Sequence, residues 1–238
     1  MYPRGMSRKN SSENWNFYWK PGTFKLEKAI YDVVARFYRQ RIIGPYFKRK
    51  MNKIFNSNEE LKLLHAGSGA GEVDQFLPLR FKILALDFSR EAVEQYRLLH
   101  PDREALEGDI FRLNEEEKYN GYFDGIYNLG VMEHFSEEEI NKAIGNFSVL
   151  LKPGGKIVLF WPPKFGLSAI FLRILEFSLR LLRRNSYEPL VPSEPSQLGF
   201  LNLELKKMLR LHGFNRIRMI FTPADLFTFI TVVAQKSK

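Results

Sequence analysis

The chain has 238 residues, contains no cysteine and carries a formal net charge of +9. Its length is enough to bury a full α/β core and favours one domain, and the lack of cysteine excludes disulfides, a thiolate nucleophile and cysteine-ligated zinc. The first twenty residues have no apolar core of the kind that a secretory signal needs, and no uncharged run approaches the length of a membrane span. We therefore expect a cytoplasmic protein.

The charge is distributed unevenly along the chain. Residues 1–53 carry thirteen Lys/Arg against three Asp/Glu, whereas residues 54–160 carry eleven against nineteen. Residues 161–184 are basic again, with five Lys/Arg and one acid. Basic segments on either side of an acidic centre predict an anionic partner, which is a phosphate-bearing substrate, a nucleic acid or a membrane surface.

The basic N-terminal segment combines an aromatic cluster with an amphipathic helix. The cluster, at residues 15–19, predicts either a staple that packs under the domain or a lid that excludes water from a pocket. Apolar residues recur at helical spacing over 26–37, and Gly44 and Pro45 should end this helix. A second basic stretch, 48–53, is predicted to be a solvated helix face.

The stretch 61–74, LKLLHAGSGAGEVD, predicts a strand, a tight turn and the start of a helix. Gly67, Gly69 and Gly71 lack the Cβ atoms that would keep a ligand away from the backbone, and the first N–H groups of the helix should face the turn. A ligand is therefore expected against this backbone. The dinucleotide fingerprint is excluded, because its third glycine would fall at Glu72.

Two acids follow the next two predicted strands. Residues 82–87 form an apolar run that ends at Asp87, and a short strand at 104–107 is followed by Gly108 and Asp109. The carboxyl ends of parallel strands meet at one edge of the sheet, so Asp87 should lie beside the glycine turn. Its carboxylate could accept both hydroxyls of a ribose there. Ser89 should cap a helix at 90–99.

The second half of the chain continues this alternation. A strand at 122–129 brings Asn128 to the same edge, a capping box at 136–139 opens a helix, and a turn at 152–155 leads into a strand at 156–161. A helix at 203–211 precedes two β-rich runs, 215–222 and 227–235, which should form an antiparallel pair that completes the sheet.

Residues 162–195 interrupt the pattern. The part 165–184 is apolar with a narrow polar stripe at helical spacing. Such a helix could be buried in its own subunit, cap a hydrophobic pocket, lie on a membrane or form a dimer interface.

Taken in order, the glycine turn, Asp87, the run 108–110, the run 128–130 and the run LKPGGKIVLFW at 151–161 resemble the class I S-adenosylmethionine-dependent methyltransferases. The likeness begins near Phe55, and the sequence VMEH at 131–134 is most similar to a broad, mostly small-molecule group of that family. The resemblance implies an α/β fold with a Rossmann-like, seven-stranded, mostly parallel sheet that has one antiparallel strand and helices on both faces. Outside the common pattern of that family, the helical spacing of apolar residues predicts an N-terminal helical extension and a helical insertion after the fifth strand.

On this resemblance the chain divides into four parts. Residues 1–53 are a basic and aromatic extension with a cap helix, and residues 54–161 are the cofactor-binding core. Residues 162–197 are an insertion over the acceptor site, and residues 198–238 supply the last helix and strands.

The resemblance implies that S-adenosylmethionine is the cofactor and S-adenosylhomocysteine the product, without a metal. Asp109 is expected to accept a hydrogen bond from the exocyclic amino group of the adenine, with Phe88 and Ile110 on either side of the ring. The residues expected to hold the cofactor are His65, Gly67, Ser68, Gly69, Gly71, Asp87, Phe88, Ser89, Asp109, Ile110, Asn128, Leu129 and Gly130. The family usually has an acid where this chain has His65, which is expected to lie deeper, against the methionine end.

The acceptor is expected to be a small or amphipathic metabolite. His134 is predicted either to act as a base or positioning residue, or to fix its own loop by a hydrogen bond. The other residues expected to line the acceptor site are Trp19, Tyr31, Tyr38, Glu133, Trp161 and Phe165. The alternatives are an RNA methyltransferase that uses the basic N-terminal segment, and an inactive scaffold at the inner face of a membrane. Peripheral membrane contact through 165–184 and a homodimer are predicted as further associations.

Overall fold

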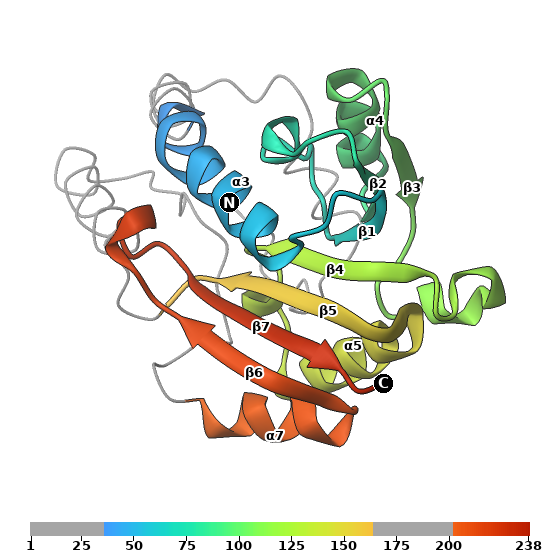
Figure 1. Cartoon of the computed structure of the whole chain (residues 1–238). Helices are drawn as coiled ribbons and strands as arrows, with labels where there is room; N and C mark the ends of the chain where they lie inside the picture. Colours follow the sequence, from blue (N-terminus) through green and yellow to red (C-terminus); the bar gives the residue numbers. More distant parts are fainter. Residues whose placement is uncertain (1–35, 164–201) are drawn as a thin grey trace, which may run out of the picture.

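The computed structural model describes residues 36–163 and 202–238, and these residues form an α/β structure around one sheet (Figure 1). The seven strands lie in the order β3-β2-β1-β4-β5-β7-β6. Their bounds are β1 Leu61–Ala66, β2 Phe81–Asp87, β3 Glu104–Glu107, β4 Phe123–Leu129, β5 Leu151–Trp161, β6 Phe214–Ile220 and β7 Ile230–Lys236.

Strands β1 to β5 run parallel to one another, and β7 is antiparallel to both of its neighbours, β5 and β6. The predicted seven-stranded, mostly parallel sheet with its single antiparallel strand is therefore confirmed, while the predicted insertion at 162–197 lies outside the described residues from residue 164 on. The final strand lies between β5 and β6, so the carboxyl ends of β1, β2 and β4 share one edge of the sheet with the start of β7.

Helices cover both faces of the sheet. Figure 1 shows α3 on one side of the central strands and α5 with α7 on the other. One core cluster joins α5 and α7 to the sheet, and the second joins α3 and the region after β1 to the opposite face. The helices are α3 Gly44–Ile54, α4 Arg90–Leu99, α5 Glu137–Leu150 and α7 Leu203–Leu211, with short helices η1 Arg39–Ile43, η2 Asp74–Phe76, η3 Leu113–Glu115, η4 Glu117–Tyr119, η5 Met132–His134 and η6 Pro223–Asp225.

The predicted helix caps are present. The Ser89 hydroxyl accepts a hydrogen bond from the Ala92 N–H at 3.3 Å at the start of α4. Ser136 and Glu139 form the reciprocal capping box at the start of α5. After α7, Gly213 has a φ of +80°, which is the left-handed conformation that commonly ends a helix.

The prediction of a helix directly after the glycine turn is wrong in the length of that helix. The chain forms only the three-residue 3₁₀ helix η2 before Leu77 becomes extended. Pro78 explains this ending, because a proline disfavours the helical conformation of the residue before it. The segment directly after the turn therefore forms no long α-helix.

The expected break at Gly44 and Pro45 is also wrong. The chain stays helical through them, because the π-helical segment η1 joins directly onto α3. The Gly44 N–H donates to the carbonyl of Arg39, and Pro45 lies in the first turn of α3, where a missing N–H costs no intrahelical bond. The part of the predicted helix before residue 36 lies outside the described residues.

Strand β5 begins earlier than expected. It starts at Leu151, so the predicted turn at 152–155 lies within the strand. A register shift in the β4–β5 pairing, between Phe123 and Gly125, accommodates the extra residues. None of the helices among residues 36–163 and 202–238 is long and apolar enough to cross a membrane.

Candidate functional site

The glycine turn after β1 lies against the end of β2. The N–H groups of Gly67 and Ser68 donate to the carbonyl of Leu86 at 2.8 and 3.0 Å. The φ values of Gly67, Gly69 and Gly71 are +71°, +52° and +66°. Residues other than glycine rarely adopt such values. The sequence of three glycines is therefore required by the backbone path itself.

Two of these glycines also make room for side chains of the protein. A Cβ at Gly67 would lie 2.8 Å from Val131, and a Cβ at Gly71 would lie 2.2 Å from the ring of Tyr96. The absence of Cβ atoms was predicted to admit a ligand, whereas at these two positions it lets the turn pack against η5 and α4. The contact with Val131 brings the connection after β4 to the glycine turn.

Asp87 meets the glycine turn as expected. Its Oδ2 accepts a hydrogen bond from the N–H of Gly69 at 2.8 Å, and its Oδ1 accepts one from the N–H of Ser89 at 2.9 Å. The side chain is 6% exposed, and burial raises the pKa of its carboxyl although both N–H groups act to lower it. Each oxygen keeps a further lone pair, so the carboxylate can still accept two hydroxyl groups.

The second predicted acid lies next to Asp87. The N–H of Gly108 donates to the backbone carbonyl of Asp87 at 2.9 Å, which places the start of the β3 loop beside the end of β2. Asp109 is exposed, and its Oδ1 accepts a hydrogen bond from the N–H of Phe111 at 2.8 Å. Ile110 is buried at 7% exposure, while Phe88 is partly exposed.

Asn128 is a buried amide at the carboxyl end of β4. It is 1% exposed, and neither its Oδ1 nor its Nδ2 has a hydrogen-bond partner among the described residues. An unpaired buried amide costs about 1–3 kcal/mol, so such a group is uncommon unless a ligand satisfies it. Gly130 follows with a φ of +66° and donates its N–H to the carbonyl of Phe160 at 3.0 Å.

His65 lies beneath the turn in a buried polar network. Its Nδ1 is 2.9 Å from Oδ2 of Asp74, and its ring stacks on Tyr127 with the centroids 4.4 Å apart. The hydroxyls of Tyr96 and Tyr127 donate to Asp74 at 2.8 and 2.7 Å. The residue that replaces the usual acid is thus paired with a different acid, nine positions further along the chain.

Asp74 is fully buried, yet it stays ionised. Burial acts to raise the pKa of this carboxyl, but the His65 ring and the hydroxyls of Tyr127 and Tyr96 outweigh it, and the pKa lies below its ordinary value. The N–H of Asp74 also donates to the carbonyl of Gly71 at 2.8 Å, and His100 Nε2 lies 2.8 Å from the same carbonyl. The network therefore holds the glycine turn from below.

Replacing Asp74 by Asn is expected to lower the free energy of unfolding by about 3 kcal/mol, because the buried hydroxyls of Tyr96 and Tyr127 lose the charged acceptor of their hydrogen bonds and His65 loses the carboxylate beside its Nδ1. Urea unfolding followed by circular dichroism measures this. The matched control is Glu94→Gln, which breaks the exposed pair of Arg90 and Glu94 and should change the free energy by about 0.5 kcal/mol or less. Equal effects of the two changes would contradict the role given to Asp74.

His134 is held neutral by its surroundings. Burial lowers its pKa to about 4, and its Nε2 lies 4.0 Å from Glu133 Oε1, too far for a hydrogen bond that would offset this. Glu133 is 3% exposed and lies with His134 on η5, which directly follows Val131, the residue that contacts the glycine turn. A pKa this low makes His134 a weak base at neutral pH and favours a positioning role.

The titration of His134 predicts a pH dependence of stability. Its pKa is depressed in the folded protein relative to the ordinary value of 6.5, so the unfolded chain binds the proton first as the pH falls. The free energy of unfolding should therefore fall between about pH 6.5 and pH 4, by roughly 3 kcal/mol in total from this group. The difference between wild type and His134→Gln over this range isolates the contribution, and parallel pH profiles would refute it.

The remaining predicted acceptor residues are scattered. The Tyr38 hydroxyl donates to the backbone carbonyl of Asp225 at 3.2 Å, in the β6–β7 connection. Trp161 is 3% exposed and packs in the core. Trp19, Tyr31 and Phe165 lie outside the described residues.

Comparisons with known proteins agree with this arrangement. Residues 64–157 match the family model described as a methyltransferase domain, and these residues contain the glycine turn, Asp87, Asp109 and Asn128. Residues 64–157, fewer than half of the chain, are therefore similar to methyltransferase domains. The match ends within β5 and leaves α3, α7, β6 and β7 outside it.

The methyltransferase domain also has a relative among curated proteins. Over 124 residues the chain is 29% identical to an uncharacterized methyltransferase of Anoxybacillus flavithermus (strain DSM 21510 / WK1). The alignment covers 47% of this chain and 49% of the relative, so the chain spans about half the length of the curated protein that it matches.

Solved structures show the same fold. Magnesium protoporphyrin IX methyltransferase from Synechocystis PCC 6803, with bound S-adenosylhomocysteine, has a TM-score of 0.56 at 18% identity. The superposition covers 94% of this chain and 93% of the methyltransferase chain. The CurJ carbon methyltransferase has a TM-score of 0.57 at 17% identity and covers 80% of this chain and 52% of its own. These likenesses confirm the fold around the methyltransferase domain.

The buried network around Asp74 was not predicted from the sequence. Asp74, Tyr96 and Tyr127 were not predicted to act together, because they lie on three elements that the chain brings together only in the folded sheet. His65, at a position where the family usually has an acid, is the one residue whose type indicates a compensating acid elsewhere in the chain.

Proposed function

We propose that the chain is an S-adenosylmethionine-dependent methyltransferase that acts on a small or amphipathic acceptor. The observation that carries the proposal is the buried Asp87 carboxylate, fixed by the N–H of Gly69 at 2.8 Å inside a matched methyltransferase domain. The unpaired amide of Asn128 at the same edge of the sheet supports it, because a polar ligand would supply the missing hydrogen bonds.

The residues of the site divide the work between holding and orienting. S-adenosylmethionine supplies a methyl group that its sulfonium has already activated. Asp87 would hold the ribose hydroxyls and Asp109 the adenine amino group. The cofactor would lie against the backbone of the glycine turn. The protein's main contribution to an in-line displacement is alignment of the reacting groups and exclusion of water.

The connection after β4 is where the acceptor should meet the methyl group. Val131 packs against Gly67, so η5 and its neutral His134 adjoin the glycine turn. A neutral imidazole can accept a hydrogen bond from an acceptor hydroxyl or amine and orient its lone pair. It contributes little as a base at neutral pH, since its pKa is about 4.

Two alternatives remain as proposals with less support. An RNA methyltransferase is favoured by the basic segment 1–53, and binding of tRNA that persists at physiological salt would support it. The second alternative is an inactive scaffold, which the histidine at position 65 favours because the family usually has an acid there. The pairing of His65 with Asp74 gives that residue a structural role within the domain.

Calorimetric titration with S-adenosylhomocysteine tests the proposal directly. The intact protein is expected to bind it, and Asp87→Ala should weaken binding at least tenfold through the loss of two hydrogen bonds, each worth about 1 kcal/mol. Asp87→Asn, which keeps the volume of the side chain, should weaken binding as well. The control is Asp102→Ala at an exposed position after α4, and absence of binding at millimolar ligand would refute the function.

Asn128 gives a second test with effects of opposite sign. Asn128→Leu removes a buried amide that has no partner among the described residues, so the free protein should gain about 1 kcal/mol of unfolding free energy. Binding of S-adenosylhomocysteine should weaken about tenfold, because the ligand loses the amide. A loss of stability with unchanged binding would show that Asn128 serves the fold instead.

A further inference from the structure

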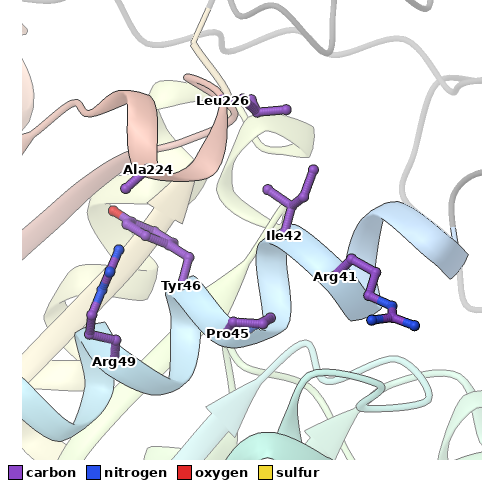
Figure 2. Close-up of a pocket in the computed structure, with 7 residues that line it drawn as sticks. All are labelled: Arg41, Ile42, Pro45, Tyr46, Arg49, Ala224 and Leu226. Carbon is purple, nitrogen blue, oxygen red and sulfur yellow. The ribbon is translucent and has the colours of Figure 1, made fainter.

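A cavity of about 300 Å³ lies between the helix η1–α3 and the connection from β6 to β7 (Figure 2). Ile42 and Pro45 line it from the helix, and Ala224 and Leu226 line it from the connection. The remaining lining residues are Arg41, Tyr46 and Arg49. The cavity lies outside the matched domain and was not predicted from the sequence.

The cavity opens at the same edge of the sheet as the glycine turn. Strand β7 is antiparallel, so its first residue, Ile230, pairs with Trp161, the last residue of β5. The residues just before Ile230 therefore lie beyond the carboxyl ends of the parallel strands. Strand β7 is two positions from β4 in the sheet, so the cavity should lie on the order of 10 Å from the end of β4.

The start of the helix beside the cavity contacts two loops at this edge of the sheet. Arg39 pairs with Glu72, which follows the glycine turn, at 2.5 Å. The hydroxyl of its neighbour Tyr38 is hydrogen-bonded to Thr228 and to the backbone of Asp225. The π-helical segment η1 thus links the loop of the methyltransferase domain to the loop that forms the far wall of the cavity.

The wall itself is preformed. Tyr46 is 4% exposed, and its hydroxyl lies 3.0 Å from Oγ1 of Thr231 in β7. Leu226 and Phe227 have φ values of +52° and +56°, although neither is glycine. Such conformations cost of order 1 kcal/mol each and persist where the surrounding contacts fix them.

The cavity has a positive charge. Residues 36–54 contain seven Lys/Arg and no acid. In Figure 2, Arg49 rises beside Tyr46 toward Ala224, whereas the guanidinium of Arg41 is turned away and only its stem adjoins the cavity. The described residues of the lining include no acid, and Asp225, which lies in sequence between Ala224 and Leu226, is fully buried and its Oδ2 accepts a hydrogen bond from the N–H of Phe229 at 3.0 Å.

We propose that this cavity binds an oxyanion, a carboxylate or a phosphate, that is attached to an apolar or aromatic part of the methyl acceptor. Arg49 would donate to the anion, and Ile42, Leu226 and the ring of Tyr46 would contact the apolar part. A guanidinium binds such oxyanions through paired N–H donors and stacks on flat groups. The proposal rests on the proposed function and adds a substrate class to it, an anionic amphiphile whose charge is on the order of 10 Å from the methylated atom.

The test uses 1-naphthyl phosphate as the probe and neutral 1-naphthol as its matched counterpart. Binding to the intact protein is measured by calorimetry, with and without S-adenosylhomocysteine. The phosphate should bind at least tenfold more tightly than the naphthol, and Arg49→Met should weaken phosphate binding at least tenfold. Lys48→Met removes the same charge from the neighbouring exposed position, outside the cavity lining, and should change binding less than twofold.

A cavity-filling change provides a second variant. Ala224→Leu adds volume on the exposed η6 wall and should weaken both probes while leaving the binding of S-adenosylhomocysteine unchanged. Equal effects of Arg49→Met and Lys48→Met, equal binding of the two probes, or no phosphate binding would overturn the proposal. Failure of S-adenosylhomocysteine to bind, with phosphate binding intact, would instead refute the proposed function and leave the anion site standing.

Discussion

A carboxylate without access to solvent organises the centre of this protein. Asp74 receives Tyr96 from α4, Tyr127 from β4 and His65 from β1, and its own N–H holds the glycine turn. Burying an unpaired charge would cost more than the fold could offset, so all these partners must be in place together. The shape of the turn, and with it the position of Gly69 against Asp87, depends on this network.

Sequence reasoning succeeded where the signal is local. The caps at Ser89 and Ser136 and the strand that ends at Asp87 follow from short-range chemistry, and the strand order follows from the family resemblance. It failed where distant residues decide the outcome. The partners of Asp74 are 9, 22 and 53 residues away from it, and no short pattern encodes such contacts. Pro78 predicts the end of η2, whereas the glycine pattern predicts a longer helix.

The two sides of the site are built differently. The proposed cofactor side is made of backbone N–H groups, the buried Asp87 and the exposed Asp109, all within the matched residues 64–157, so motifs of a few residues predict it. The proposed acceptor side is formed by η1, α3 and the connection before β7, which lie outside that match. Its walls depend on side-chain packing between segments about 180 residues apart, as the contact of Tyr38 with Asp225 illustrates, and such packing follows no short pattern.

The position of β7 affects how the sheet assembles during synthesis. Strand β6 reaches the rest of the sheet only through β7, and the ribosome completes β7 sixteen residues after the end of β6. Strand β7 ends 75 residues after β5, so at typical translation rates of about 5–20 residues per second the open edge of β5 waits roughly 4 to 15 seconds for its neighbour. The β6–β7 hairpin can pair locally in that interval and dock as a unit, which shields the apolar edge of β5 from other nascent chains.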